Sequence, residues 1–211
     1  MHMMRLGIFP CIGTCAQHGA IVHNLIQTAD TPSITVEVEW VQNASRLATL
    51  DALIIPSAPA SALRRFITLP DWEEAILSYM QAEKPLWMTG QATALIADGT
   101  LLDEKALFRR LKSSLIEGRS STGKHRGRWF QPFWETLSIA RIACDYHAPF
   151  VQWVSHDPRP TMHILAKWRD HPVVFWEKQF FYTVFSPELS GDYRIHEYFL
   201  RYLLMNRSRH G

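Results

Sequence analysis

The sequence predicts an α/β fold, a three-layer sandwich in which helices cover a mixed, mostly parallel sheet. In the first half, short apolar stretches alternate with stretches whose apolar residues recur at helical spacing. Strands that alternate with helices imply parallel pairing through right-handed crossovers. In the second half, several short strand-like stretches precede one final helix. With 211 residues and 47% hydrophobic content, residues 1–211 are expected to form a single domain around one core.

The first half is expected to supply four strands and their helices. The strands are predicted at 6–9, 34–40, 51–56 and 85–88, and the stretch 34–40 alternates with period two, as in a strand with one wet face. Helices are predicted at 16–28, 60–66 and 71–81, and a further one begins within 92–97. Asp71 or its predecessor is expected to cap the helix at 71–81, and Glu73 and Glu74 suit its first turn.

The second half begins with a polar, basic segment. Residues 112–128 are rich in glycine, serine and basic side chains, which indicates a mobile loop. Strands are then predicted at 137–143, 150–154, 162–168, 173–176 and 180–185, and a helix runs from about Asp192 past Leu203. The aromatic residues at 129–134 are expected to lie mostly in the core, or to form a protein–protein patch beside the basic loop.

Composition excludes several classes of function. A net charge of +2 is too small to indicate a nucleic-acid or anionic-membrane partner, and no apolar run approaches the roughly 20 residues of a spanning helix. Met1–Arg5 leads directly into a strand, so no leader segment is expected. Cys11, Cys15 and Cys144 cannot form a disulfide framework, which favours a cytoplasmic protein. No second Cys/His pair completes a zinc set, so no structural metal is expected. No cofactor is expected either.

The functional crevice is expected at the carboxyl ends of the parallel strands. Ligands of open α/β sheets bind there, so the loops after Phe9, Pro56, Met88 and Phe185 should converge. The segments containing these loops are LGIFPCIGTCAQHGAIVHNL (6–25), LDALIIPSAPASALRRFI (50–67), KPLWMTGQATALIA (84–97) and FSPELSGDYRIHEYFL (185–200). In that order they resemble the class I glutamine amidotransferases, most closely the glutaminase subunit of pyridoxal phosphate synthase. The resemblance implies a flavodoxin-like sandwich.

The resemblance also implies a catalytic triad, and this sequence departs from it. The family uses a cysteine on a tight strand-to-helix turn, a histidine base and an orienting carboxylate. The matching positions here are Gly90, Ser186 and Glu188. Glycine has no side chain, and a hydroxyl does not take up a proton near neutral pH as an imidazole does. The glutamine-holding loop has also changed, to Ser57-Ala58-Pro59-Ala60, so glutamine hydrolysis by the usual triad is not expected.

Three functions remain open. The first is a catalytically degenerate subunit that binds a protein partner, for which the resemblance implies a (β/α)8 synthase; a homo-oligomer is the other option. The second is an enzyme of changed specificity with a relocated thiol, Cys11 or Cys15, and His18 as its base, although such cysteines also simply pack. The third is a small-ligand sensor without chemistry.

Candidate ligand-binding residues lie in the same loops. They are Gly13, Ser57, Ala58, Gly90, Gln91 and Arg119. The backbone of Gly90 and Gln91 either donates to an anion at the start of the following helix or forms a plain turn. The basic stretch that contains Arg119 either grips phosphate or an acidic partner, or is a solvated loop.

Overall fold

A computed structural model describes residues 2–9, 20–21, 23–25, 34–58, 70–96, 133–150, 156 and 158–210. Residues 20–21 and 23–25 are helical, in agreement with part of the helix predicted at 16–28. The predicted helix at 60–66 and the predicted mobile loop at 112–128 lie outside the described residues.

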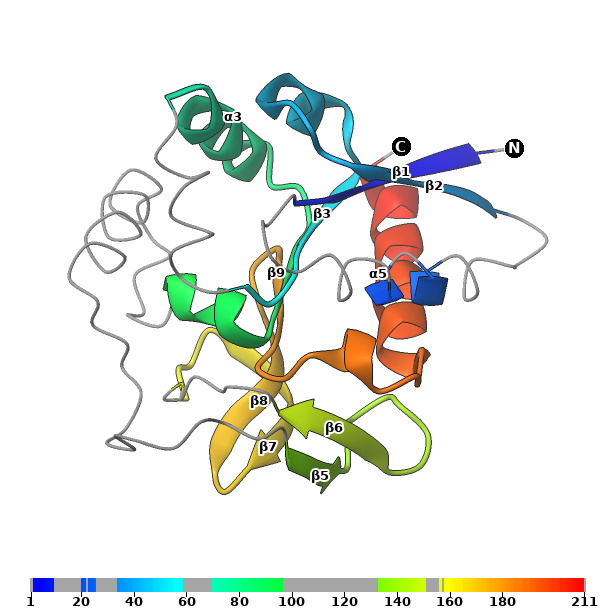
Figure 1. Ribbon diagram of the computed structural model, residues 1–211, viewed down its shortest axis with the longest axis vertical. Coiled ribbons are helices and arrows are strands. Elements are labelled where there is room, and N and C mark those ends of the chain that lie inside the picture. The colour runs from blue at the N-terminus through cyan, green and yellow to red at the C-terminus, as the bar shows by residue number, and fades with distance from the viewer. Residues whose placement is uncertain are drawn as a thin grey trace.

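A seven-stranded mixed sheet forms the centre of the fold, in the order β2-β1-β3-β4-β9-β8-β7 (Figure 1). Its strands are β1 (His2–Ile8), β2 (Ile34–Trp40), β3 (Ala52–Ile55), β4 (Leu86–Thr89), β7 (Met162–Trp168), β8 (His171–Glu177) and β9 (Phe180–Thr183). The pairs β2-β1, β1-β3, β3-β4 and β4-β9 are parallel, whereas β9-β8 and β8-β7 are antiparallel. The predicted α/β fold with a mostly parallel sheet is therefore confirmed.

Two long helices lie on opposite sides of this sheet (Figure 1). One is α3 (Pro70–Gln81), which begins one residue before the predicted start, with Asp71 and Glu73 in its first turn. Pro70 and Asp71 both lie inside the helix, so the prediction that one of them caps it was wrong. The other is α5 (Arg194–His210), whose Phe199 packs on Trp87 of β4 at a ring-centroid distance of 5.0 Å. Trp87 and Phe199 are fully buried, so the aromatic face of the sheet and α5 form one side of the core.

The described residues also form three short 3-10 helices: η1 (Ala44–Thr49), η2 (Gly90–Ile96) and η3 (Pro187–Leu189). The helix predicted to begin within 92–97 is η2, which begins at the end of β4. The sequence analysis did not predict η1. Among the described residues, no helix is long and apolar enough to cross a membrane.

One strand prediction in the second half was wrong. The strand predicted at 137–143 is not formed, because β5 (Phe133–Leu137) ends at its first residue. Phe150, the first residue of the strand predicted at 150–154, is the last residue of β6 (Tyr146–Phe150), which pairs antiparallel with β5 in a separate two-stranded sheet; residues 151–154 lie outside the described residues. Residues 138–145 form the connection, with positive φ angles of 69° at Arg141 and 60° at Cys144. Ile139 is buried from within this connection, which produced the apolar alternation mistaken for a strand.

The aromatic residues near the basic loop divide between core and surface. Phe133 stacks on Phe150 at 5.1 Å and contacts Trp168, as a core residue does. Trp134 is 54% exposed, on the outer face of the two-stranded sheet. Residues 129–130 lie outside the described residues.

Candidate functional site

The chain makes a tight strand-to-helix turn at Gly90, between β4 and η2. Gly90 has a φ of 50°, a left-handed conformation that glycine adopts without strain. Its N–H donates to the carbonyl of Phe185 across 2.9 Å, and its own carbonyl accepts the hydroxyl of Thr93 at 2.7 Å. We call residues 89–91 the elbow.

Ser57, two residues after β3, packs directly on the elbow. Its N–H donates to Oγ1 of Thr89 across 2.9 Å, and its own Oγ accepts the N–H of Gln91 at 3.1 Å. A Cβ atom built on Gly90 would lie 2.4 Å from Oγ and 2.6 Å from Cβ of Ser57. The serine side chain therefore fills the space that a side chain at position 90 would need.

Ser186 and Glu188 reach the same place from the end of β9. The Oγ of Ser186 lies 2.9 Å from the Cβ position of Gly90, and the Ser186 N–H donates to the carbonyl of Pro149 at 3.1 Å. Glu188 in η3 accepts the Thr89 hydroxyl through Oε1 at 3.2 Å. The loops after β3, β4 and β9 thus converge, as the parallel sheet predicted.

The carboxyl group of Glu188 is buried without a basic partner among the residues that the structure describes. Burial raises its pKa from 4.5 to about 7, and hydrogen bonds from its own backbone and from Thr89 offset only part of that rise. Its Oε2 and the Oγ of Ser186 have no hydrogen-bond partner in the described part of the chain. In the part of the chain that the structure describes, this cluster consists of the hydroxyls of Ser57, Thr89 and Ser186 and the carboxyl of Glu188, with no imidazole and no sulfur in contact with them.

His196 is a buried histidine of α5 that lies against the core. Its ring meets the ring of Trp87 edge-on at 5.0 Å, and neither ring nitrogen has a hydrogen-bond partner among the described residues. Burial lowers its pKa to about 3, so the ring is neutral at physiological pH.

A known protein family matches most of this chain. The profile of the SNO glutamine amidotransferase family matches residues 13–205. The chain belongs to this family. Two similar proteins are each named pyridoxal 5'-phosphate synthase subunit PdxT. That of Haloarcula marismortui is 26% identical over 195 residues, which cover 92% of this chain and 94% of the relative. That of Geobacillus sp. is 28% identical over 204 residues, which cover 94% and 96%.

Solved structures agree with the family on the fold. A glutamine amidotransferase crystal structure superposes with a TM-score of 0.68 at 20% identity, covering 94% of this chain and 98% of its own. The glutaminase domain of Trypanosoma brucei CTPS, solved with bound acivicin, superposes with a TM-score of 0.57 at 8% identity, covering 90% and 91%. The resemblance stated from the sequence is confirmed for both family and fold.

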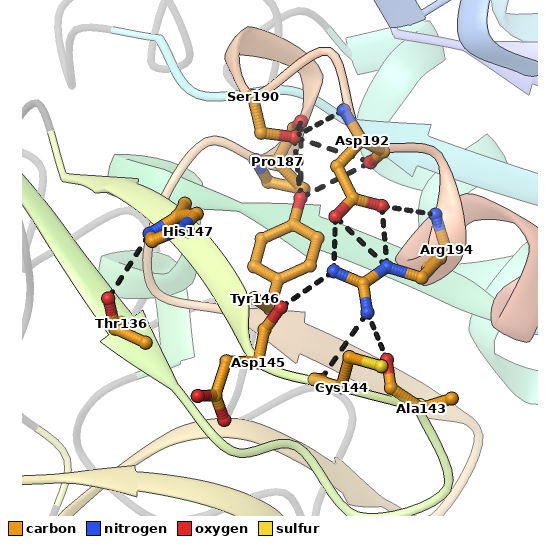
Figure 2. Close-up of polar contacts among 10 residues, drawn as sticks. All are labelled: Thr136, Ala143, Cys144, Asp145, Tyr146, His147, Pro187, Ser190, Asp192 and Arg194. Atoms are coloured by element: carbon orange, nitrogen blue, oxygen red, sulfur yellow. Dashed lines mark hydrogen bonds and ion pairs between the residues drawn. The ribbon is translucent and has the colours of Figure 1, made fainter.

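A second polar network holds the segment that carries Ser186 and Glu188 (Figure 2). The Tyr146 hydroxyl lies 2.7 Å from Oγ of Ser190, on the chain that follows η3. Arg194 binds the carboxylate of Asp192 and donates to the carbonyls of residues 143–145. Figure 2 shows the guanidinium between these two groups, so α5 is tied to the connection between β5 and β6.

The structure brings together six of the predicted site residues and leaves the others undescribed. Ser57, Ala58, Gly90, Gln91, Ser186 and Glu188 lie at or beside the elbow, and all but the half-buried Gln91 are buried. Cys11, Gly13, Cys15, His18 and Arg119 lie outside the described residues. Across the described part of the chain, no group of three or more His, Cys, Asp or Glu side chains could hold a metal ion.

Two features of the site were not anticipated from the sequence. Thr89 joins Ser57 to Glu188; its position just before Gly90 was the only available signal. The backbone donors proposed for an anion are also engaged, since the Gly90 N–H binds Phe185 and the Gln91 N–H binds Ser57. In this conformation neither donor is left for a ligand.

Proposed function

We propose that this chain is a glutaminase-like subunit that binds a protein partner and does not hydrolyse glutamine through a Cys-His-Glu triad. The observation that carries the proposal is the elbow itself. Gly90 stands at its turn with a φ of 50°, and Ser57 and Ser186 crowd the position of the missing side chain. We take Gly90, Ser186 and Glu188 to be the triad positions of the family.

The chemistry of these groups supports the loss of hydrolysis. Covalent catalysis needs a nucleophile and a base within hydrogen-bond reach, and Gly90 supplies no nucleophile. Glu188 is buried with a pKa raised to about 7 by desolvation, and no imidazole of the described residues connects it to the elbow. The Gln91 N–H, a candidate donor to the oxyanion of a tetrahedral intermediate, already binds Ser57.

The names of the relatives suggest the class of partner. Both similar proteins quoted above are named as subunits of pyridoxal 5'-phosphate synthase. We therefore propose a synthase-type partner in the cytoplasm and a regulatory or scaffolding role for this chain. A complex between copies of this chain is the alternative assembly.

Complex formation tests the binding part of this proposal. The purified chain is mixed with a pyridoxal phosphate synthase subunit from the same cell and analysed by size-exclusion chromatography with light scattering. The expected result is co-elution at the summed mass. Separate elution of the two proteins at micromolar concentration contradicts a synthase-type partner.

Thiol titration tests the competing enzyme with a relocated nucleophile. Cys144 is exposed and serves as the internal standard for an ordinary thiol. The proposal predicts that Cys11 and Cys15 react no faster than Cys144 at neutral pH. A fast-reacting thiol that is lost in Cys11→Ala or Cys15→Ala would favour the enzyme, and stabilisation by amino acids or phosphorylated sugars in a thermal-shift screen would favour the sensor.

A further inference from the structure

The side chain of Ser57 occupies the space that a side chain at position 90 would need. A Cβ on Gly90 would approach Oγ of Ser57 to 2.4 Å and its Cβ to 2.6 Å, distances that real Cβ atoms essentially never show. Ser57 is 6% exposed, and its N–H is fixed by Thr89 at 2.9 Å. Because the backbone of Ser57 is held in place, it cannot retreat without breaking this hydrogen bond.

The Ser57 hydroxyl also accepts the hydrogen bond of a backbone N–H in the turn, that of Gln91. The N–H groups at the start of a helix have no partner within that helix, so they are available to side chains or ligands. In this chain the Gln91 N–H, the second amide of η2, is taken by Oγ of Ser57 at 3.1 Å. In strand-to-helix nucleophile turns, the amide after the nucleophile is a donor to the developing oxyanion. The Ser57 side chain therefore fills the space that a nucleophile at position 90 would need, and it also binds the Gln91 N–H that would stabilise the oxyanion.

We infer that Ser57 is the residue that closes this site: a side chain at position 90 and a serine at position 57 exclude each other, and the Ser57 hydroxyl replaces any ligand on the Gln91 amide. This inference deepens the proposed function, on which it rests for its biological meaning. It implies that replacing Gly90 and Ser186 alone does not rebuild a working elbow. Position 57 has to become glycine as well.

Gly191 provides a matched control for position 90. Both glycines have positive φ angles, 50° at Gly90 and 68° at Gly191. A Cβ added at Gly191 meets nothing within 4 Å, so Gly191→Ala reports the backbone cost alone. We expect its melting temperature to fall by about 2–6 °C, and that of Gly90→Ala to fall by at least about 5 °C more.

Two changes at Ser57 then separate its bulk from its hydroxyl. Ser57→Gly removes the two closest atoms, Oγ and Cβ, and leaves the hydroxyl of Ser186 at 2.9 Å. Most of the added loss at position 90 should therefore disappear when Ser57→Gly/Gly90→Ala is compared with Ser57→Gly. Ser57→Ala keeps the Cβ that lies 2.6 Å from the built atom, so Ser57→Ala/Gly90→Ala should regain much less. Ser57→Gly and Ser57→Ala should both speed hydrogen exchange of the Gln91 amide at least about tenfold, because its acceptor is gone.

These measurements test the role of Ser57 independently of the proposed function. Equal falls in melting temperature for Gly90→Ala and Gly191→Ala overturn the inference. So does a fall for Ser57→Gly/Gly90→Ala, relative to Ser57→Gly, that is as large as the fall for Gly90→Ala relative to wild type. The second outcome counts even if both variants are unfolded. Unchanged exchange of the Gln91 amide overturns the second half. Glutamate release by the wild type would instead refute the proposed function, and it leaves these stability comparisons intact.

Discussion

The hydroxyl of Thr89 joins the end of β4 to Glu188 in η3 through a buried hydrogen bond of 3.2 Å. The same oxygen accepts the N–H of Ser57 at 2.9 Å, so one side chain links the loops after three parallel strands. Thr89 is 1% exposed and cannot exchange these partners for water. It is the centre of the buried polar cluster.

Thr89→Val should therefore cost about 1–3 kcal/mol of the free energy of unfolding, because it removes the acceptor of the Ser57 N–H and the hydroxyl that donates to the Glu188 carboxyl. Urea denaturation measures this difference. Thr49→Val is the control, since the exposed Thr49 hydroxyl binds the carbonyl of Arg46, three residues earlier in the chain. Equal stability of Thr89→Val and wild type would show that the link contributes nothing.

Glu188 should make the protein less stable as pH rises. Its folded pKa of about 7 lies above the ordinary value of 4.5, so the folded state holds the proton more tightly than the unfolded state does. Its contribution is fully present below pH 4.5 and is lost as pH rises through about 7. Glu188→Gln removes this dependence, and its stability relative to wild type should rise by about 2–3 kcal/mol between pH 5 and pH 8. Parallel pH profiles for the two proteins would contradict the burial of an uncompensated carboxyl.

His196 should make the protein less stable as pH falls, the opposite of the effect of Glu188. Its folded pKa of about 3 lies below the ordinary 6.5, so the unfolded state takes up a proton first and stability is lost as pH falls below 6.5. His196→Phe preserves the ring against Trp87 and cannot titrate. Relative to wild type it should gain about 2 kcal/mol between pH 8 and pH 5 in chemical denaturation. No gain would mean that the His196 ring reaches a proton-stabilising partner.

The contribution of Arg194 to the free energy of unfolding should depend on the shape of its guanidinium group more than on its charge. Its guanidinium binds the carboxylate of Asp192 and the carbonyls of residues 143–145, which a lysine ammonium cannot reproduce together. Arg194→Lys is expected to cost about 1–2 kcal/mol in urea denaturation. Arg201→Lys, in an exposed pair with Glu197, should stay within about 0.5 kcal/mol. Similar losses for the two variants would contradict the role given to Arg194.

Most strands could be predicted because apolar periodicity and burial agree in them. The stretch 162–168 is a strand with the predicted bounds, and 34–40 likewise matches β2. The prediction failed at 137–143 because Ile139 is buried from a turn whose Arg141 and Cys144 adopt positive φ angles. Periodicity reports which side chains are buried, and it does not report the backbone conformation that buries them.

The site was predicted in its members and missed in its contacts. From the family resemblance and the carboxyl edge of the parallel sheet, the sequence predicted that Ser57, Gly90 and Glu188 lie close together. The collision between Ser57 and a side chain at position 90 depends on distances of 2.4–2.6 Å between residues 33 positions apart. No sequence pattern encodes such a contact, and the same holds for the capture of the Gln91 amide.

Glutamate release from free glutamine is the most direct test of the central claim. The purified wild-type chain is assayed alone and with a synthase subunit, beside a relative that retains cysteine and histidine at the positions of Gly90 and Ser186. The account predicts no glutamate above the enzyme-free background in either wild-type sample, and steady release by the relative. Saturable glutamate release by the wild-type chain would contradict it.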